Sequence, residues 1–400
     1  MTAPPRNMSL FALSLLGCAQ ICAWGSVYYT FSLTGPLIAR DLGLSSAMTT
    51  AGFTFALIVG AFAAAPVGHA LDRFGGRPML ALGSAFGALA MAATGVAQGP
   101  ITYALACVLL GLATATALYD AIFPALAQAA GASARRAITV VTLFGGLAST
   151  TFWPLTSALL SMLDWRQVYF VYAGAHLLFC LPVYLFALPR VTASGEVAAA
   201  AHINEPAPLQ GEARRQAFVV FGVLLALFNL VSAGLTVLMI QTLMDMGHLR
   251  NAAVFASALF GPAQVAGRVW EMATQAKVSA LGVGRVASAL LPVSLAFLVG
   301  AHWSFASAAA FALVFGLSNG LMTIAKGTVA LALFGRGGYG AMLGRLSVAS
   351  LLFRAFGPFV FAWLAALGGP ALMIALMMAC ALAALVACEY LTRIARSAHE

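Results

Sequence analysis

Charge is what this sequence of 400 residues has least of. Only 8% of its residues are Asp, Glu, Lys or Arg and 62% are hydrophobic, whereas an ordinary soluble domain has roughly 25% charged residues. Water is therefore not the main solvent of the chain. The net charge of +9 does not indicate a nucleic-acid partner, because a basic binding patch needs a folded soluble surface, which this composition does not supply.

Several chemical patterns are also missing. The six cysteines form neither a disulfide framework nor a zinc-ligand pattern, and all lie in apolar runs. No segment resembles a nucleotide-binding loop. His176 is the one histidine deep in an apolar run, and Asp120 has no second deep aspartate as a partner. We therefore expect no metal, no cofactor and no intramembrane enzyme.

Long apolar runs dominate what is present. A transmembrane helix needs about 20 mostly apolar residues, and such runs recur along the whole sequence. The sequence predicts an all-α integral membrane protein with twelve transmembrane helices, at roughly 9–36, 47–70, 78–97, 102–129, 137–162, 166–188, 217–243, 252–275, 283–300, 304–334, 342–367 and 370–392.

One polar stretch divides these runs into two sets of six. The segment "PRVTASGEVAAAAHINEPAPLQGEARRQ", residues 189–216, has the composition of a connector. We therefore expect an N-terminal six-helix bundle (1–188), this linker, and a C-terminal six-helix bundle (217–400). This layout is typical of transporters whose halves rock about a central site. We expect a monomer surrounded by membrane lipid.

The positions of the basic residues predict the orientation of the chain. Most of the 20 Lys and Arg residues fall in loops on one side, whereas Arg40, Arg166 and Arg250 fall on the other. Because cytoplasmic loops carry the excess of positive charge, both termini are expected in the cytoplasm. We expect a bacterial inner (plasma) membrane location.

A short charged turn interrupts the apolar sequence between the second and third runs. It reads "GHALDRFGGRPML", residues 68–80, and contains Gly68, Asp72, Arg73, Gly75 and Arg77. Glycine permits close helix approach, and an aspartate here can cap a helix or pair with arginine. This pattern resembles the signature of the major facilitator superfamily. The resemblance implies a secondary transporter that alternates between inward-open and outward-open states, with this turn as part of a gate.

Other segments are similar to the monocarboxylate and oxalate:formate branch of that superfamily. They are "WGSVYYTFSLTGPLIARDLGLS", "GPAQVAGRVW" and "LFGRGGYGAMLGR". The resemblance implies that Arg268 binds a substrate carboxylate and that Arg354 is a second cation of the site. The turn after the eighth run does not repeat the signature. Cys107 stands where drug antiporters of the superfamily usually carry arginine.

Charged residues inside the predicted helices are the main candidates for function, because each costs about 2.5 to 3.5 kcal/mol at the bilayer centre and must face protein or water. Arg268 either grips a substrate carboxylate or pairs with Glu271, three residues further along the same helical face. Arg354 either contacts substrate or forms an intramembrane pair. Asp120 and Lys326 occupy corresponding positions in the two halves. They form a gating bridge, Asp120 takes up a coupling proton, or both simply pack.

Uncharged polar residues complete the candidate site. Tyr28 and Tyr29 lie in the first run, but adjacent helical residues point about 100 degrees apart, so at most one is expected to face a central cavity squarely. Gln264 and Asn319 could line the same route. Since there is one more cation than acid inside the predicted membrane region, we predict transport of a small organic anion, mono- or dicarboxylate-like, with a coupling proton or counter-substrate. The alternative is proton-coupled efflux of drug-like or amphipathic compounds through Asp120.

Overall fold

The computed structural model describes residues 8–189 and 208–398, and every regular element in them is a helix. Helices satisfy their own backbone hydrogen bonds, which an apolar solvent requires. Ten helical stretches in these residues are long and apolar enough to cross a membrane. Two of them, Pro100–Leu160 and Tyr339–Ser397, contain 61 and 59 residues, and each is interrupted near its middle. The all-α fold is confirmed, and the helices are consistent with twelve crossings.

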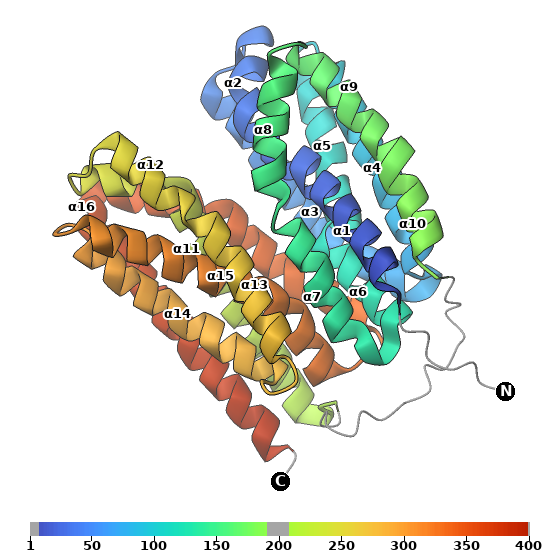
Figure 1. Ribbon diagram of the computed structural model, residues 1–400, viewed down its shortest axis with the longest axis vertical. Helices are drawn as coiled ribbons and strands as arrows, with labels where there is room; N and C mark the ends of the chain where they lie inside the picture. Colours follow the sequence, from blue (N-terminus) through green and yellow to red (C-terminus); the bar gives the residue numbers. More distant parts are fainter. Residues whose placement is uncertain (1–7, 190–207, 399–400) are drawn as a thin grey trace. The chain divides into compact units, whose positions relative to one another are not determined.

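The chain divides into two compact units (Figure 1). Unit 1 is the described part of Met1–Ile203 together with Arg336–Val348, and unit 2 is the described part of Asn204–Gly335 together with Ala349–Glu400. Most of the predicted linker, residues 190–207, lies outside the described residues. The division differs from the expected bundles at one place, since residues 336–348 belong with unit 1 rather than with the C-terminal half.

Unit 1 contains the helices up to Ala187 and the beginning of α16. Its elements are α1 (Leu10–Trp24), η1 (Gly25–Tyr29), α2 (Phe31–Asp41), α3 (Ser46–Phe74), α4 (Gly76–Gly95), α5 (Pro100–Ala117), α6 (Tyr119–Ala130), η2 (Gly131–Ser133), α7 (Ala134–Gly145), α8 (Ala148–Leu160), α9 (Trp165–Ala175), η3 (His176–Cys180) and α10 (Leu181–Ala187). Two of these, η1 and η3, are π-helical segments inside longer helices.

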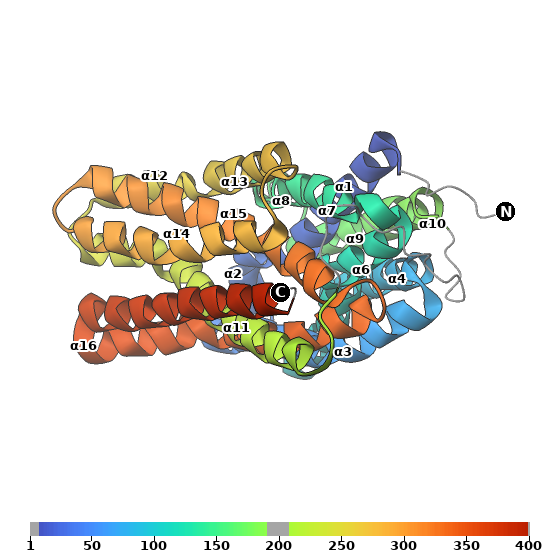
Figure 2. The same ribbon diagram turned by 90° about the horizontal axis from the view of Figure 1, so that it is seen from below.

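Unit 2 contains α11 (Gly211–Asp245), α12 (Arg250–Ala258), α13 (Phe260–Thr274), α14 (Ala280–Gly300), α15 (Phe305–Phe334) and most of α16 (Tyr339–Ser397). Helices α14 and α15 lie side by side (Figures 1 and 2). Non-helical backbone at Gly368 and Gly369 separates the two arms of α16. Gly369 has a φ of 72°, a conformation that glycine adopts without strain.

Several crossings predicted as continuous runs contain breaks. The run at 102–129 is interrupted at Leu118, whose backbone is extended between α5 and α6. The run at 252–275 is interrupted at Leu259, three residues before Pro262. A proline lacks an N–H and cannot continue the bond pattern of a preceding helix. Helix α11 begins at Gly211, so the last residues of the predicted linker are helical.

Candidate functional site

Polar side chains of unit 2 meet near the middle of its helices. The Ser232 hydroxyl of α11 donates to Asn319 Oδ1 of α15 at 2.8 Å, and Asn229 Nδ2 of α11 donates to Ser350 Oγ of α16 at 2.9 Å. Hydrogen bonds of this kind join helices inside a membrane, where water does not compete for the polar groups. Asn319 is therefore held by α11 at a defined position on α15.

Two glycines bring α13 against α15 at this level. A Cβ atom on Gly320 would overlap the backbone of Gln264, and one on Gly267 would lie 3.0 Å from the carbonyl oxygen of Leu317. Small residues at such positions allow helix backbones to approach closely. The predicted site residues Gln264 and Asn319 consequently lie at the same depth, which the sequence did not establish.

Arg268 is one turn further along α13. Its side chain is 3% exposed, and Nη2 donates to Gln264 Oε1 at 3.4 Å. Glu271, on the same helical face, is fully buried. Either a bound carboxylate or Glu271 can balance the arginine charge in this arrangement, and both interpretations remain predictions.

Lys326 and Arg354 are the remaining cations predicted for the site. Both are half-buried. Arg354 lies one turn after Ser350 on α16, on the same helical face. Lys326 lies about two turns beyond Asn319 on α15. The predicted pairing of Lys326 with Asp120 stays a prediction.

Asp120 of unit 1 bonds to a residue that the sequence did not single out. Its Oδ1 accepts a hydrogen bond from the hydroxyl of Ser347 at 2.6 Å, and Ser347 is fully buried. Ser347 lies in the segment 336–348, which contains the first turns of α16. One charged residue of unit 1 therefore holds the beginning of a helix that continues into unit 2.

The signature turn binds the same segment. Asp72 Oδ1 accepts from the backbone N–H of Gly340 at 2.9 Å, and Oδ2 accepts from that of Ala341 at 2.7 Å. These N–H groups belong to the first turn of α16, where a helix leaves donors without intrahelical partners. A carboxylate at this place also interacts favourably with the helix dipole. The expectation that Asp72 caps a helix agrees with this geometry.

Close packing of small residues supports the cap. A Cβ atom on Gly68 would overlap the carbonyl of Gly340, and one on Gly344 would overlap the carbonyl of Ala64. Ala64, Gly68 and Asp72 are spaced four residues apart on α3, and Gly340 and Gly344 are spaced in the same way on α16. The two helices therefore touch along matching stripes, which we call the glycine contact.

The remaining signature residues shape the turn itself. Gly75 ends α3 with a φ of 86°, which favours glycine. The Arg73 guanidinium lies over the Phe74 ring at 5.1 Å, and Arg77 is half-buried in the first turn of α4. Gln128 of α6, which the sequence did not indicate, accepts from Gly76 N at 2.9 Å and donates to Leu71 O at 3.1 Å.

Tyr28 and Tyr29 lie in the π segment η1, where they contact each other. Their ring centroids are 5.4 Å apart and nearly perpendicular. Tyr28 also contacts Trp24 and Phe53, and Tyr29 contacts Trp153. The prediction that these two side chains point about 100 degrees apart assumed an α-helix. That angle does not apply to η1, since the hydrogen-bond pattern of a π segment differs from that of an α-helix.

A second set of polar groups lies inside unit 1 and is uncharged. Gln20 Nε2 donates to the carbonyl of Ala117 at 2.8 Å and to the hydroxyl of Tyr184 at 2.9 Å. Ser26 Oγ and His176 Nε2 are 2.9 Å apart, which joins the two π segments η1 and η3. These residues are fully or almost fully buried, so they hold the helices of unit 1 together.

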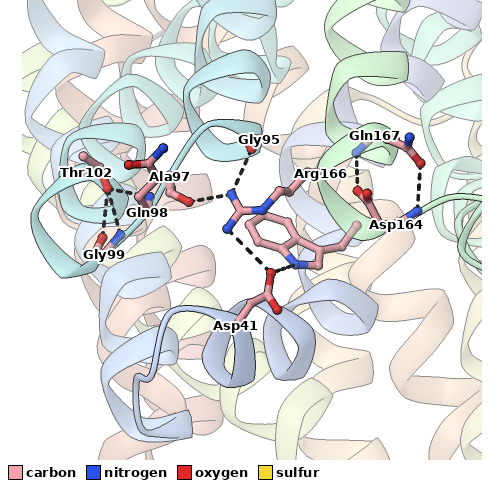
Figure 3. A network of polar contacts seen from close by, with 10 residues as sticks. Asp41, Gly95, Ala97, Gln98, Gly99, Thr102, Asp164, Arg166 and Gln167 are labelled. Atoms are coloured by element: carbon pink, nitrogen blue, oxygen red, sulfur yellow. Dashed lines mark hydrogen bonds and ion pairs between the residues drawn. The ribbon is translucent and has the colours of Figure 1, made fainter.

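An ionic network lies at the end of unit 1 that is farther from the signature turn, where α2 and α4 end (Figure 3). We call this the opposite end and the end with the signature turn the signature end. Arg166 Nη1 donates to the carbonyls of Gly95, at 3.0 Å, and Ala97, and Nη2 lies 3.5 Å from Asp41 Oδ2. Trp165 Nε1 donates to the same Asp41 oxygen at 3.0 Å. The network joins the ends of α2 and α4 to the start of α9.

Two further observations concern ligands. In the described ranges, 8–189 and 208–398, no group of three or more His, Cys, Asp and Glu side chains is arranged to hold a metal ion. An apolar groove of about 400 Å³ lies between α1 and α10, lined by residues such as Phe11, Pro182 and Phe186. None of the predicted site residues lines it.

Comparison with known proteins decides the family. The family model described as Major Facilitator Superfamily matches residues 16–335. The chain belongs to the major facilitator superfamily. The predicted resemblance to the superfamily is thereby confirmed, and the resemblance to its monocarboxylate and oxalate:formate branch stays a prediction. No curated protein matches the chain by sequence.

Solved structures of the major facilitator superfamily share the fold. One is the proton:xylose symporter XylE bound to 6-bromo-6-deoxy-D-glucose, with a TM-score of 0.71, 15% identity, and 94% of each chain covered. Another is the human organic anion transporter MFSD10 (TETRAN), with a TM-score of 0.69, 17% identity, and 97% of this chain and 100% of that chain covered. The protein is thus an integral membrane protein of a family of secondary transporters, which bind small-molecule substrates.

Proposed function

We propose that this protein is a secondary transporter for a small organic anion, with a mono- or dicarboxylate as the substrate class. The observation that carries the proposal is Arg268, an arginine with 3% exposure in the interior of α13. A guanidinium is permanently charged and can bind both oxygens of a carboxylate through parallel hydrogen bonds. An arginine in a transmembrane helix is costly, and such residues commonly mark a substrate or ion route.

The neighbours of Arg268 support this proposal. Gln264 and Asn319 lie at one depth because α13 and α15 touch through Gly267 and Gly320. Their amide groups can donate to the oxygens of an acid that Arg268 neutralises. Arg354 supplies a second cation for the proposed site, as its place in α16 beside Ser350 allows. A protein of the same fold is described as an organic anion transporter, and this substrate class is compatible with ours.

The gate of the proposed transporter includes the beginning of α16. Asp72 and Asp120 of unit 1 hold residues 340, 341 and 347, after which α16 continues into unit 2. Alternating access separates and rejoins the two halves of such proteins. Release of the bonds to Asp72 and Asp120 is therefore the proposed opening step, and Lys326 is the proposed new partner of Asp120 in one state.

Transport into proteoliposomes tests the proposal. Uptake of radiolabelled acetate, lactate and oxalate would be compared for the wild type, Arg268→Ala, Arg268→Lys and Asp120→Asn, with exposed Arg393→Ala as the control. We expect Arg268→Ala to abolish uptake of the transported acid and Arg268→Lys to retain part of it, because lysine keeps the charge but not the planar fork.

The alternative function makes the opposite prediction for the same variants. A proton-coupled exporter of amphipathic compounds would lose transport in Asp120→Asn and keep it in Arg268→Ala. Glu271→Gln separates the two interpretations of Arg268. If the two residues form only a structural pair, this variant lowers the melting temperature as much as Arg268→Ala does, and acids give no protection against heat.

A further inference from the structure

Three buried polar atoms of unit 1 have no hydrogen-bond partner among the described residues. They are Oε1 of Gln20 on α1, Oγ of Ser84 on α4 and Nδ1 of His176 at the start of η3. All three residues are fully buried. A polar atom that is buried without a partner destabilises a fold, so each such atom in a native protein requires a physical explanation.

Helix α4 brings Ser84 close to the imidazole of His176. Gly87 lies three residues after Ser84, on the same face of the helix. A Cβ atom on Gly87 would lie 2.6 Å from Nδ1 of His176. The absence of a side chain at Gly87 therefore lets the imidazole pack directly against α4, one turn from the Ser84 hydroxyl.

The same stretch of α4 packs near Gln20. A Cβ atom on Gly83, the residue before Ser84, would lie 3.2 Å from the backbone nitrogen of Ala117. The carbonyl of Ala117 accepts a hydrogen bond from Gln20 Nε2 at 2.8 Å. Gln20 and His176 are thus both held beside residues 83–87 of α4.

The existing hydrogen bonds determine which of these atoms are donors. Ser26 donates its single hydroxyl proton to the Cys22 carbonyl at 2.7 Å, so Nε2 of His176 is the donor in its 2.9 Å contact with Ser26. Nδ1 of the neutral imidazole is then an acceptor. Gln20 donates through Nε2 to two oxygens, which leaves its Oε1 as a second acceptor. The Ser84 hydroxyl supplies one donor.

We propose that Gln20, Ser84 and His176 bind one ordered water molecule inside unit 1. A water molecule has two protons to donate, one to Gln20 Oε1 and one to His176 Nδ1, and it accepts the proton of the Ser84 hydroxyl. Buried water molecules in proteins make about three hydrogen bonds to groups of this kind. The inference concerns unit 1 alone and goes beyond the proposed function, on which it does not rest.

A proton on His176 would also supply a donor, but it is the less favourable ligand. It would satisfy Nδ1 and at most one other atom, and it would place a positive charge among apolar helices. The side chains of Cys22, Cys180 and Tyr184 lie beside Gln20 and His176 and are uncharged at neutral pH, so they do not balance that charge. A water molecule satisfies all three atoms and remains neutral.

The bound water joins two groups of contacts into one network. Gln20 connects α1 to the end of α5 and to α10, whereas His176 and Ser26 connect η3 to η1. With the water in place, the network includes α4 as well. It therefore holds the π segment η1, which also contains Tyr28 and Tyr29.

A crystal structure of the full-length protein, at a resolution that shows ordered solvent, tests the site directly. We expect one solvent peak within hydrogen-bond distance of Gln20 Oε1, Ser84 Oγ and His176 Nδ1. A direct hydrogen bond between Ser84 and His176, without a solvent peak, would overturn the proposal.

Nitrogen-15 NMR of histidine-labelled protein in lipid distinguishes water from a proton. The chain has six histidines, so the signal of His176 is assigned by its loss in His176→Gln. We expect a neutral imidazole at neutral pH, protonated on Nε2, with an Nδ1 shift typical of a hydrogen-bonded acceptor. An imidazolium signal, or an Nδ1 shift typical of an acceptor without a donor, would overturn the proposal.

A double-mutant cycle tests whether Gln20 and Ser84 share a ligand. Because loss of the water removes the contribution of both partners, the melting temperature of Gln20→Leu with Ser84→Ala should fall by about 2 to 4 °C less than the sum of the two single shifts. Buried, apolar Ala88 lies one turn after Ser84, and Ala88→Gly with Gln20→Leu is the matched control, for which we expect additive shifts. Additive shifts for Gln20→Leu with Ser84→Ala would contradict a shared water molecule.

Discussion

The two ends of unit 1 use similar chemistry for different tasks. At the opposite end, Arg166 and Asp41 join α2, α4 and α9, and all the partners belong to unit 1. At the signature end, Asp72 and Asp120 bind residues 340–347, and the helix that begins there continues into unit 2. Residues 340–347 also belong to unit 1, but α16 continues from them into unit 2. If the protein alternates as proposed, we expect the contacts to this part of α16 to change during transport and the contacts of Arg166 to persist.

This difference predicts how substitutions at the two ends behave. Changes at the opposite end should lower the stability of the fold and leave the transport rate per folded molecule unchanged. Changes at the signature end should alter transport more than stability. The four substitutions below test this contrast, in order from the largest expected effect on transport to the smallest.

Gly68→Ala should have the largest effect. Its Cβ atom would overlap the carbonyl of Gly340, and overpacking of this kind costs about 1 to 3 kcal/mol. A cost of about 1.4 kcal/mol lowers the population of the state that contains this contact about tenfold, and we expect a similar loss of uptake in proteoliposomes. Gly174→Ala is the control, because a Cβ there has no atom within 4 Å. Equal uptake by the two variants would contradict the glycine contact.

Ser347→Ala should have the next largest effect, because it removes the hydrogen bond to Asp120. A hydrogen bond to a charged group contributes about 1.5 to 3 kcal/mol. We expect maleimide to label Leu343→Cys, a fully buried position, several times faster when Ser347→Ala is also present, in a background without the six native cysteines. Exposed Ser397→Ala on the same helix should leave the labelling rate unchanged. An unchanged rate in Ser347→Ala would show that the bond does not hold α16.

Asp72→Asn should have a smaller effect, because asparagine keeps an oxygen acceptor but loses the charge that favours a helix N-terminus. That interaction contributes about 0.3 to 1 kcal/mol. The matched control is Asp164→Asn at the opposite end, where Asp164 Oδ1 accepts from Gln167 N at 2.8 Å (Figure 3). We expect a two- to fivefold change in uptake for Asp72→Asn, in proportion to that energy. The same change for Asp164→Asn would remove the contrast between the ends.

Arg166→Ala should have the smallest effect on transport. The side chain is 29% exposed, so we expect a loss of about 1 to 2 kcal/mol in the free energy of unfolding, chiefly from carbonyls that lose their donor. A thermal unfolding scan should show a lower melting temperature, whereas uptake per folded molecule and the KM should match the wild type. Exposed Arg40→Ala should affect neither quantity. A raised KM in Arg166→Ala would place this network in the transport cycle.

The fold was largely predictable, because crossing a membrane requires long apolar runs and leaves little choice of secondary structure. The role of Asp72 was predictable in kind, since a carboxylate after a glycine-rich helix can cap another helix. Its partners were not predictable, because Gly340 is more than 250 residues away along the sequence. Ser347 and Gln128 gave no signal, since a single serine or glutamine in an apolar helix is common. The angle between Tyr28 and Tyr29 depended on a π segment that the residue pattern did not indicate.

By itself, the sequence determined that the chain lies in a membrane, that its class is all-helical and that it carries the superfamily signature, and it predicted two sets of six crossings. Hydropathy acts locally, residue by residue along the chain, so it can be recognised in the order of the amino acids. Only the tertiary structure decided that Gln264, the partner of Arg268, lies against Gly320 beside Asn319, and that Asp72 and Asp120 hold the first turns of α16. Those contacts depend on glycines that let distant helix backbones touch, and the partner of a glycine is set by packing in three dimensions.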